Sequence, residues 1–170
     1  MPAFDIDMSN PFPSGCTGGL GGPNTGDHQP PHWYIQFGMD LAAPGGTDVY
    51  AAFDAHITKY KPHDPAQDTP KVYGAELFMR APNDLMGGFY THLTAVPSDL
   101  AVGSSISRGD YLGTVYKVTS TAAHLHLALV EIINGTYQGV DLYQLFLDTR
   151  NTDEVTTVTF MQDGTPPTHK

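Results

Sequence analysis

Short runs of β-forming residues, each ended by a turn residue, fill most of this chain and constrain its fold more than any other feature. The runs are rich in Val, Ile, Tyr and Phe, and most alternate apolar with polar residues or are continuously apolar. Gly and Pro supply 18 and 14 of the 170 residues, which argues against a helical bundle. The sequence therefore predicts a single all-β domain. The expected strands are residues 33–42, 48–53, 56–61, 71–81, 87–93, 111–118 and 124–133.

Three parts can be separated along the chain: a Gly/Pro-rich arm or active-site loop at 1–31, a β domain at 32–147, and a C-terminal extension at 148–170. Residues 11–31 are expected to form an ordered loop or a flexible arm rather than a helix or strand, because Gly and Pro dominate them. Helical spacing is convincing only at 141–149. The extension offers one possible strand at 155–160 and then a Pro-rich tail that we expect to fray.

Charge and cysteine content exclude several classes of function. The chain has 8 Lys and Arg against 18 Asp and Glu, so nucleic acid and anionic membrane surfaces are not expected partners. Cys16 is the only cysteine, which excludes a disulfide scaffold and a Cys-based zinc site. Any metal would therefore be bound by histidines, of which there are 8, and carboxylates. Residues 1–10 do not read as a signal peptide, and no apolar run is long enough to span a membrane.

The sharpest local motif is His124-Leu125-His126 inside an apolar run. Residues two apart in a strand point to the same face, so both imidazoles would project together while Leu125 faces a core. Two adjacent rings suit two metal bonds, or one metal bond beside one catalytic group. Two histidines on a polar sheet surface are the alternative interpretation.

Two further residues could share a site with this pair. Asp40 lies between Met39 and Leu41, where a carboxylate is costly to bury unless it is paired or binds a cation. It could instead cap the turn that follows. His92 ends the expected strand 87–93 and, taken alone, fits a packed or surface histidine as well as a catalytic one.

Four blocks taken in order resemble a known family. FGMDLAAPGGTDVYAAFDAHIT, GGFYTHL, VGSSISRGDYLGTV and AAHLHLALVE are similar to the core of the lysostaphin-type zinc metallopeptidases, which are bacterial cell-wall endopeptidases. The resemblance covers residues 32–147 and implies antiparallel sheets that frame a groove. It also implies hydrolysis of peptide cross-links in bacterial peptidoglycan through a metal-activated water, in an extracellular or periplasmic location.

Carried over to this chain, the resemblance implies that Asp40 and His126 bind Zn²⁺. It implies that His92 and His124 are catalytic, with the water activated by one and the oxyanion stabilised by the other. Zinc with three protein ligands keeps an open position for water and lowers its pKa, which agrees with these roles. Peptidoglycan or a peptide is then the expected partner, and the oligomeric state stays open.

The first ligand departs from the family pattern, because the usual histidine four residues before the Asp is Gln36 here. One explanation takes the ligand from further upstream, and we assign it to His32, with His28 as the alternative in the same arm. The other explanation is a catalytically inactive module that binds cell wall or regulates another hydrolase. We favour the first, because Asp40, His92, His124 and His126 are all present. A carbohydrate- or calcium-binding module is a further rival, but no clustered Asp loop supports it.

Overall fold

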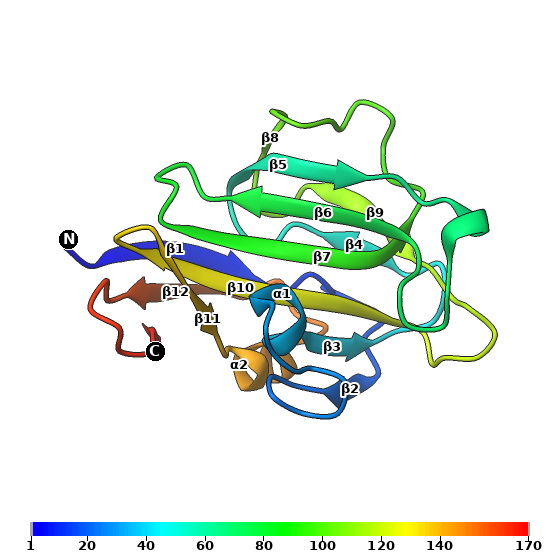
Figure 1. Cartoon of the computed structure of the whole chain (residues 1–170), viewed down its shortest axis with the longest axis horizontal. Coiled ribbons are helices and arrows are strands. Elements are labelled where there is room, and N and C mark those ends of the chain that lie inside the picture. The colour runs from blue at the N-terminus through cyan, green and yellow to red at the C-terminus, as the bar shows by residue number, and fades with distance from the viewer. Residues whose placement is uncertain (1, 170) are drawn as a thin grey trace.

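Antiparallel pairing joins the strands throughout residues 2–169, which are the residues that the computed structural model describes (Figure 1). A ten-stranded sheet runs in the order β2, β3, β10, β7, β6, β5 and β8, with β11 beside β10 and β9 joining β4 to β7. Its strands are β2 (Gly18–Gly21), β3 (Met39–Ala42), β4 (Asp48–Tyr50), β5 (Ala55–Lys61), β6 (Ala75–Arg80), β7 (Met86–Thr94), β8 (Ser105–Ile106), β9 (Tyr111–Val115), β10 (His124–Ile133) and β11 (Thr136–Val140). A second sheet contains β1 (Phe4–Ser9), β12 (Val155–Phe160) and β13 (Thr168–His169). The all-β prediction is confirmed.

The helices are short: α1 (Trp33–Gln36), a 3-10 turn η1 (Pro65–Gln67) and α2 (Tyr143–Thr149). None of the helices in the described part of the chain is long and apolar enough to cross a membrane.

β7 and β10 form the centre of the large sheet, and most of their residues are buried. Leu125, Leu127 and Leu129 face one core together with Tyr90, whose hydroxyl accepts a 3.0 Å hydrogen bond from the backbone N–H of Ala52. His124 and His126 alternate with these leucines and therefore face the opposite side of the sheet. The prediction that the two imidazoles share one face and the leucines the other is confirmed.

Two expected strands agree with the structure residue for residue. Those expected at 48–53, 71–81 and 111–118 run past the ends of β4, β6 and β9, and the one expected at 33–42 is partly helix. β10 occupies 124–133 and β12 occupies 155–160, as expected. The strand expected at 33–42 is instead helix α1, a break at Phe37 and Gly38, and then β3. A Cβ at Gly38 would lie 2.1 Å from the His126 ring. The backbone thus passes too close to β10 for any side chain, and it leaves the sheet as one helical turn before this point.

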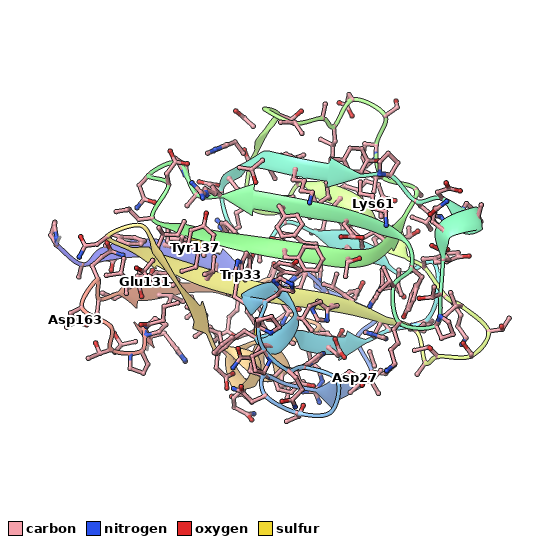
Figure 2. The ribbon with its side chains drawn as sticks, viewed as in Figure 1. Asp27, Trp33, Lys61, Glu131, Tyr137 and Asp163 are labelled. Atoms are coloured by element: carbon pink, nitrogen blue, oxygen red, sulfur yellow. The ribbon has the colours of Figure 1, made fainter. Side chains whose placement is uncertain are left out.

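Aromatic side chains hold α1 over the sheet. Trp33 packs edge to face against Phe78 of β6 and Tyr137 of β11, at centroid separations of 6.3 and 6.5 Å. Figure 2 shows Trp33 and Tyr137 on the same side of the sheet, above β10. The aromatic and apolar residues at 33–37 therefore pack as a helical turn, although their composition is typical of a strand.

The N-terminal arm contains strands that were not expected. β2 lies inside 11–31, where we predicted no element, so that prediction is wrong for Gly18–Gly21. Glycines give a strand no pattern to read, but a Cβ at Gly19 would lie 2.1 Å from the Tyr143 hydroxyl, so close packing requires glycine here. β1 also lies in the arm and pairs with β12, where Phe4 stacks on Phe160 at 5.3 Å.

The C-terminal extension is docked on the large sheet instead of frayed. The backbone N–H and side-chain amide of Gln162 both donate to one carboxylate oxygen of Glu131 in β10, at 2.8 and 2.9 Å. Both residues are buried. His169, which we expected to be unstructured, lies in β13 and is exposed. The extension therefore adds two strands, β12 and β13, and a buried contact to the domain.

Candidate metal and catalytic site

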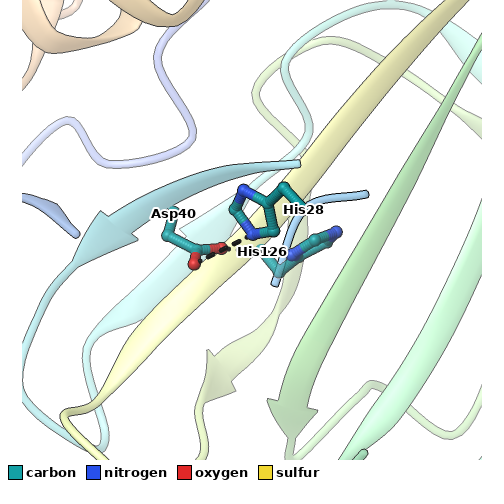
Figure 3. A group of neighbouring side chains, drawn as sticks. All are labelled: His28, Asp40 and His126. Carbon is teal, nitrogen blue, oxygen red and sulfur yellow. Dashed lines mark hydrogen bonds and ion pairs between the residues drawn. The ribbon is translucent and has the colours of Figure 1, made fainter. Parts of the chain in front are cut away.

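Asp40 and His126 are brought together by the pairing of β3 with β10. The two residues are direct partners in the antiparallel register, so their side chains leave the same face of the sheet. The Oδ1 atom of Asp40 lies 3.1 Å from Nδ1 of His126 (Figure 3). Two residues separated by 86 positions in the sequence thus form the floor of a site.

His28 completes the cluster from the arm. Its Nε2 lies 3.2 Å from Oδ2 of Asp40, and its ring packs edge to face against His126 at 5.1 Å. One ligand atom from each of His28, Asp40 and His126 lies within 4.8 Å of the others (Figure 3). Ligand atoms of a tetrahedral zinc site lie about 3.3 Å apart, given bonds of about 2.0–2.2 Å. The carboxylate therefore stands at a suitable separation from each of the two rings.

Backbone carbonyls fix the orientation of all four histidines around the site. One ring nitrogen of each histidine lies 2.7–3.0 Å from a carbonyl oxygen. The pairs are His28 Nδ1 with Gly22, His92 Nδ1 with Tyr73, His124 Nδ1 with Ala122 and His126 Nε2 with Tyr34. A carbonyl can only accept, so the nitrogen facing it carries the proton. In a neutral ring the other nitrogen is then an unprotonated acceptor.

This assignment has a consequence at Asp40. The acceptor nitrogens of neutral His28 and His126 both face an ionised carboxylate at hydrogen-bond distance. Nε2 of His28, Nδ1 of His126 and the carboxylate oxygens of Asp40 are then all acceptors, and they repel one another without a proton between them. The cluster therefore requires either protonated rings or a cation. The donor set of two imidazoles and one carboxylate suits zinc. The described residues therefore fit a zinc ion by charge, ligand type and spacing.

The pKa values agree with a site built for a cation. Burial would raise the pKa of Asp40, but the contacts with His126 and His28 outweigh burial and hold that pKa below its ordinary value. The carboxylate of Asp40 conversely raises the pKa of His28, against the opposing effect of burial.

His92 and His124 lie beside the cluster. Their ring centroids are 4.8 Å apart, and His92 lies 5.9 Å from His126. Nε2 of His124 is 3.8 Å from the Asp40 carboxylate. Burial, together with the neighbouring histidines, lowers the pKa of His92 to about 3, so this ring is neutral at physiological pH. The structure thus brings Asp40, His92, His124 and His126 close together, and their roles stay a prediction.

A β-bulge places His92 on this side of the sheet. Thr91 pairs with Glu76 and Leu93 pairs with Ala75, so His92 has no partner in β6. Its φ of 69° lies in the left-handed region, which is uncommon for a histidine. Thr91 already faces the site, and strict alternation would turn His92 toward the core. The bulge redirects the ring, which no sequence pattern indicates.

The two other candidates for the first ligand lie away from the cluster. His32 is exposed and stacks on Tyr34 at 5.0 Å. Gln36 directs its amide to the side chain of Asn24, at 2.7 Å. His28, which we held as the alternative to His32, is the arm histidine at Asp40. Spacing from Asp40 favoured His32, and nothing in the sequence shows that the loop before α1 folds back to deliver a residue twelve positions upstream.

The remaining histidines are engaged elsewhere. His56 lies 3.4 Å from the Asp84 carboxylate on the surface, and His63 pairs with Asp68 at 2.8 Å.

A cavity of about 640 Å³ opens over the cluster. All four site histidines and Asp40 line it, and its walls come from the arm and from the segment between β5 and β6. Leu20, Ile35 and Val72 make these walls largely apolar. A mostly apolar cavity with a few convergent polar groups is typical of a substrate site.

Comparison with known proteins supports the resemblance seen in the sequence. The model of peptidase family M23 matches residues 34–140. No curated protein matches the chain. Three similar solved structures share the fold. Lysostaphin from Staphylococcus simulans is 19% identical, with a TM-score of 0.55, and the match covers 84% of this chain and 55% of that one. The catalytic domain of the prophage-encoded M23 protein EnpA from Enterococcus faecalis is 17% identical (TM-score 0.54; 77% of this chain, 93% of that one), and the deep-sea M23 metalloprotease pseudoalterin is 16% identical (TM-score 0.54; 78% of this chain, 74% of that one). Against the lysostaphin chain solved by NMR, the match spans 46% of that chain's length.

Proposed function

Because this chain belongs to peptidase family M23, we propose that it is a zinc-dependent endopeptidase that hydrolyses peptide cross-links of bacterial peptidoglycan. His28, Asp40 and His126 are the proposed ligands. The observation that carries the proposal is the convergence of one ring nitrogen from each of His28 and His126 on the Asp40 carboxylate, while a backbone carbonyl holds the other nitrogen of each ring. Such carbonyl contacts orient metal-binding histidines and fix their tautomers.

The zinc ion, when bound, would supply a Lewis acid and lower the pKa of a water in its open position. The chain's own residues would handle the proton. His124 directs Nε2 toward the cluster, 3.8 Å from the Asp40 carboxylate, so it can take the proton of the attacking water and later deliver it to the leaving amine. His92, with Nδ1 protonated and Nε2 unpaired among the described residues, is the second candidate for this role.

The cavity supports a peptide as the substrate. Apolar side chains line much of the cavity above the cluster, and the few polar groups converge on its floor, which suits a peptide. Peptidoglycan is the substrate class that the family resemblance implies, and an extracellular or periplasmic location follows from the same proposal.

Zinc content tests the ligand set. We expect the wild type and His32→Ala to bind one zinc per chain, and His28→Ala to bind far less under the same conditions. These two substitutions remove the same side chain from the same arm, so they form a matched pair. Retention of zinc by His28→Ala and its loss from His32→Ala would return the first ligand to His32.

A second pair tests the division of roles within β10. His126→Ala is expected to lose both zinc and hydrolysis of purified peptidoglycan, whereas His124→Ala should keep zinc and lose hydrolysis. Equal loss of zinc in both variants would contradict the assignment. A wild type that binds no zinc when zinc is supplied would instead support the alternative, an inactive module that binds cell wall or regulates another hydrolase.

A further inference from the structure

Tyr73 lies directly against the proposed catalytic residues. It is the second residue before β6, and its side chain is buried, with a residue exposure of 3%. Its ring stacks on His92 at 3.9 Å with an interplanar angle of 14° and meets the edge of His124 at 6.4 Å. Its backbone carbonyl accepts the hydrogen bond from Nδ1 of His92. Tyr73 also lines the cavity that holds Asp40 and His126.

The hydroxyl of Tyr73 has no hydrogen-bond partner among residues 2–169. Among the described residues, three buried side-chain oxygens are unpaired, and the other two belong to Glu131 and Gln162, which contact each other at the C-terminal extension. The Tyr73 hydroxyl is the only donor of the three. A buried hydroxyl without a partner lowers stability, so its presence beside a catalytic cluster calls for a functional reason.

The segment before β6 holds this side chain in place. Gly74 has a φ of 77°, and its N–H donates to Oδ1 of Asp68 at 3.1 Å. Asp68 in turn pairs with His63 at 2.8 Å, so the acceptor of this hydrogen bond is itself held in place. A Cβ at Gly74 would lie 2.9 Å from the backbone of Leu93, which requires glycine. The backbone next to Tyr73 is therefore held in place, and stacking on His92 orients the ring.

We propose that Tyr73 is a catalytic residue that donates a hydrogen bond to the oxyanion formed from the scissile carbonyl. This inference rests on the proposed peptidase function. In the step concerned, the water oxygen bonds to the carbonyl carbon, its proton passes to a histidine, and the π electron pair moves onto the carbonyl oxygen. Tyr73 keeps its proton and stabilises the negative charge. The C–N bond then breaks, and the amine nitrogen takes the proton from the histidine.

The ionisation of Tyr73 is consistent with this role. Burial and then the charge of Asp40 raise its pKa to about 12, so the phenol remains a donor at neutral pH.

Tyr73→Phe compared with Tyr90→Phe tests the proposal, because both remove one buried hydroxyl from the same domain. In Tyr73→Phe we expect unchanged zinc content, an unchanged or raised melting temperature, and kcat on peptidoglycan lowered about 100-fold with little change in KM. Tyr90→Phe should lower the melting temperature, because its hydroxyl is hydrogen-bonded to Ala52, and should keep kcat at a temperature where it is folded.

Binding of inorganic phosphate, a tetrahedral anion, gives a readout without turnover. Calorimetry with the zinc-loaded proteins should show at least about tenfold weaker binding to Tyr73→Phe than to the wild type. Equal kcat or equal phosphate affinity in the two proteins would overturn the role of Tyr73. If the wild type hydrolyses no peptidoglycan, the proposed function fails, and the phosphate comparison still decides whether Tyr73 binds an oxyanion.

Discussion

Replacing Gly38 by alanine should remove zinc binding while the fold remains. Gly38 lies between α1 and β3, and an added Cβ would stand 2.1 Å from Cε1 of His126 and 2.9 Å from its Nδ1. Gly38 is not among the residues with positive φ, so alanine meets no backbone strain there. The perturbation is therefore a steric one, directed at a proposed ligand.

The size of the effect follows from these distances. Tight contacts in proteins begin near 3.4 Å, so the ring must retreat by about 1.3 Å, the difference between 3.4 and 2.1 Å. Bonds to zinc tolerate deviations of only about 0.2 Å. The displaced ring also loses the 2.7 Å hydrogen bond to the Tyr34 carbonyl. We expect zinc affinity to fall by about 100-fold or more, equivalent to about 2.7 kcal/mol.

Competition with a chromophoric zinc chelator measures this affinity, and circular dichroism with thermal melting shows whether the variant is folded. Gly45→Ala is the matched control, because Gly45 also lacks a positive φ. Its added Cβ would lie 3.0 Å from the Cβ of Lys117 and 3.9 Å from two backbone atoms, and it would touch no histidine of the site. The control should bind zinc like the wild type. A folded Gly38→Ala protein with wild-type zinc affinity would refute the placement of His126 in the metal site.

Three further predictions concern stability. Phe160→Ala should lower the free energy of unfolding by about 3–5 kcal/mol, since the ring is fully buried and stacks on Phe4. Urea denaturation measures this free energy, and a change below about 1 kcal/mol would show that the small sheet adds little stability. Tyr90→Phe should cost about 1–3 kcal/mol, because the N–H of Ala52 loses its acceptor, and an unchanged urea midpoint would contradict this. Zinc at 100 times its dissociation constant should stabilise the wild type by about 2.7 kcal/mol and His126→Ala hardly at all, whereas equal shifts would place zinc elsewhere.

Residues inside regular strands were predictable from the sequence. His124 and His126 share a face because alternation is a property of any strand, and Asp40 stood out because it interrupts an apolar run. The direct pairing of Asp40 with His126 across β3 and β10 is a matter of register, which single-strand patterns do not contain; the family resemblance implied only that both residues bind zinc.

Residues in irregular backbone were not predictable in the same way. His28 approaches Asp40 because the arm folds back and its ring is held by the carbonyl of Gly22. His92 faces the site only through a bulge, and Tyr73 reaches it from a loop whose closing contacts run through Gly74. Each depends on loop closure between distant segments, which leaves no periodic pattern in the sequence. Helix α1 was not predicted for another reason, because its aromatic residues are typical of a strand.

The attachment of His28 to a loop has a kinetic consequence. Asp40 and His126 belong to paired strands, in which exchange of the backbone amide hydrogens with solvent requires extensive unfolding. His28 instead lies in the loop between β2 and α1. The contact from this loop to the opposite wall is an exposed ion pair between Asp27 and Lys71, at 3.5 Å, which contributes little stability. Local opening of this one segment would free one ligand of three, so the rate of metal release should follow the loop's hydrogen exchange and not global unfolding.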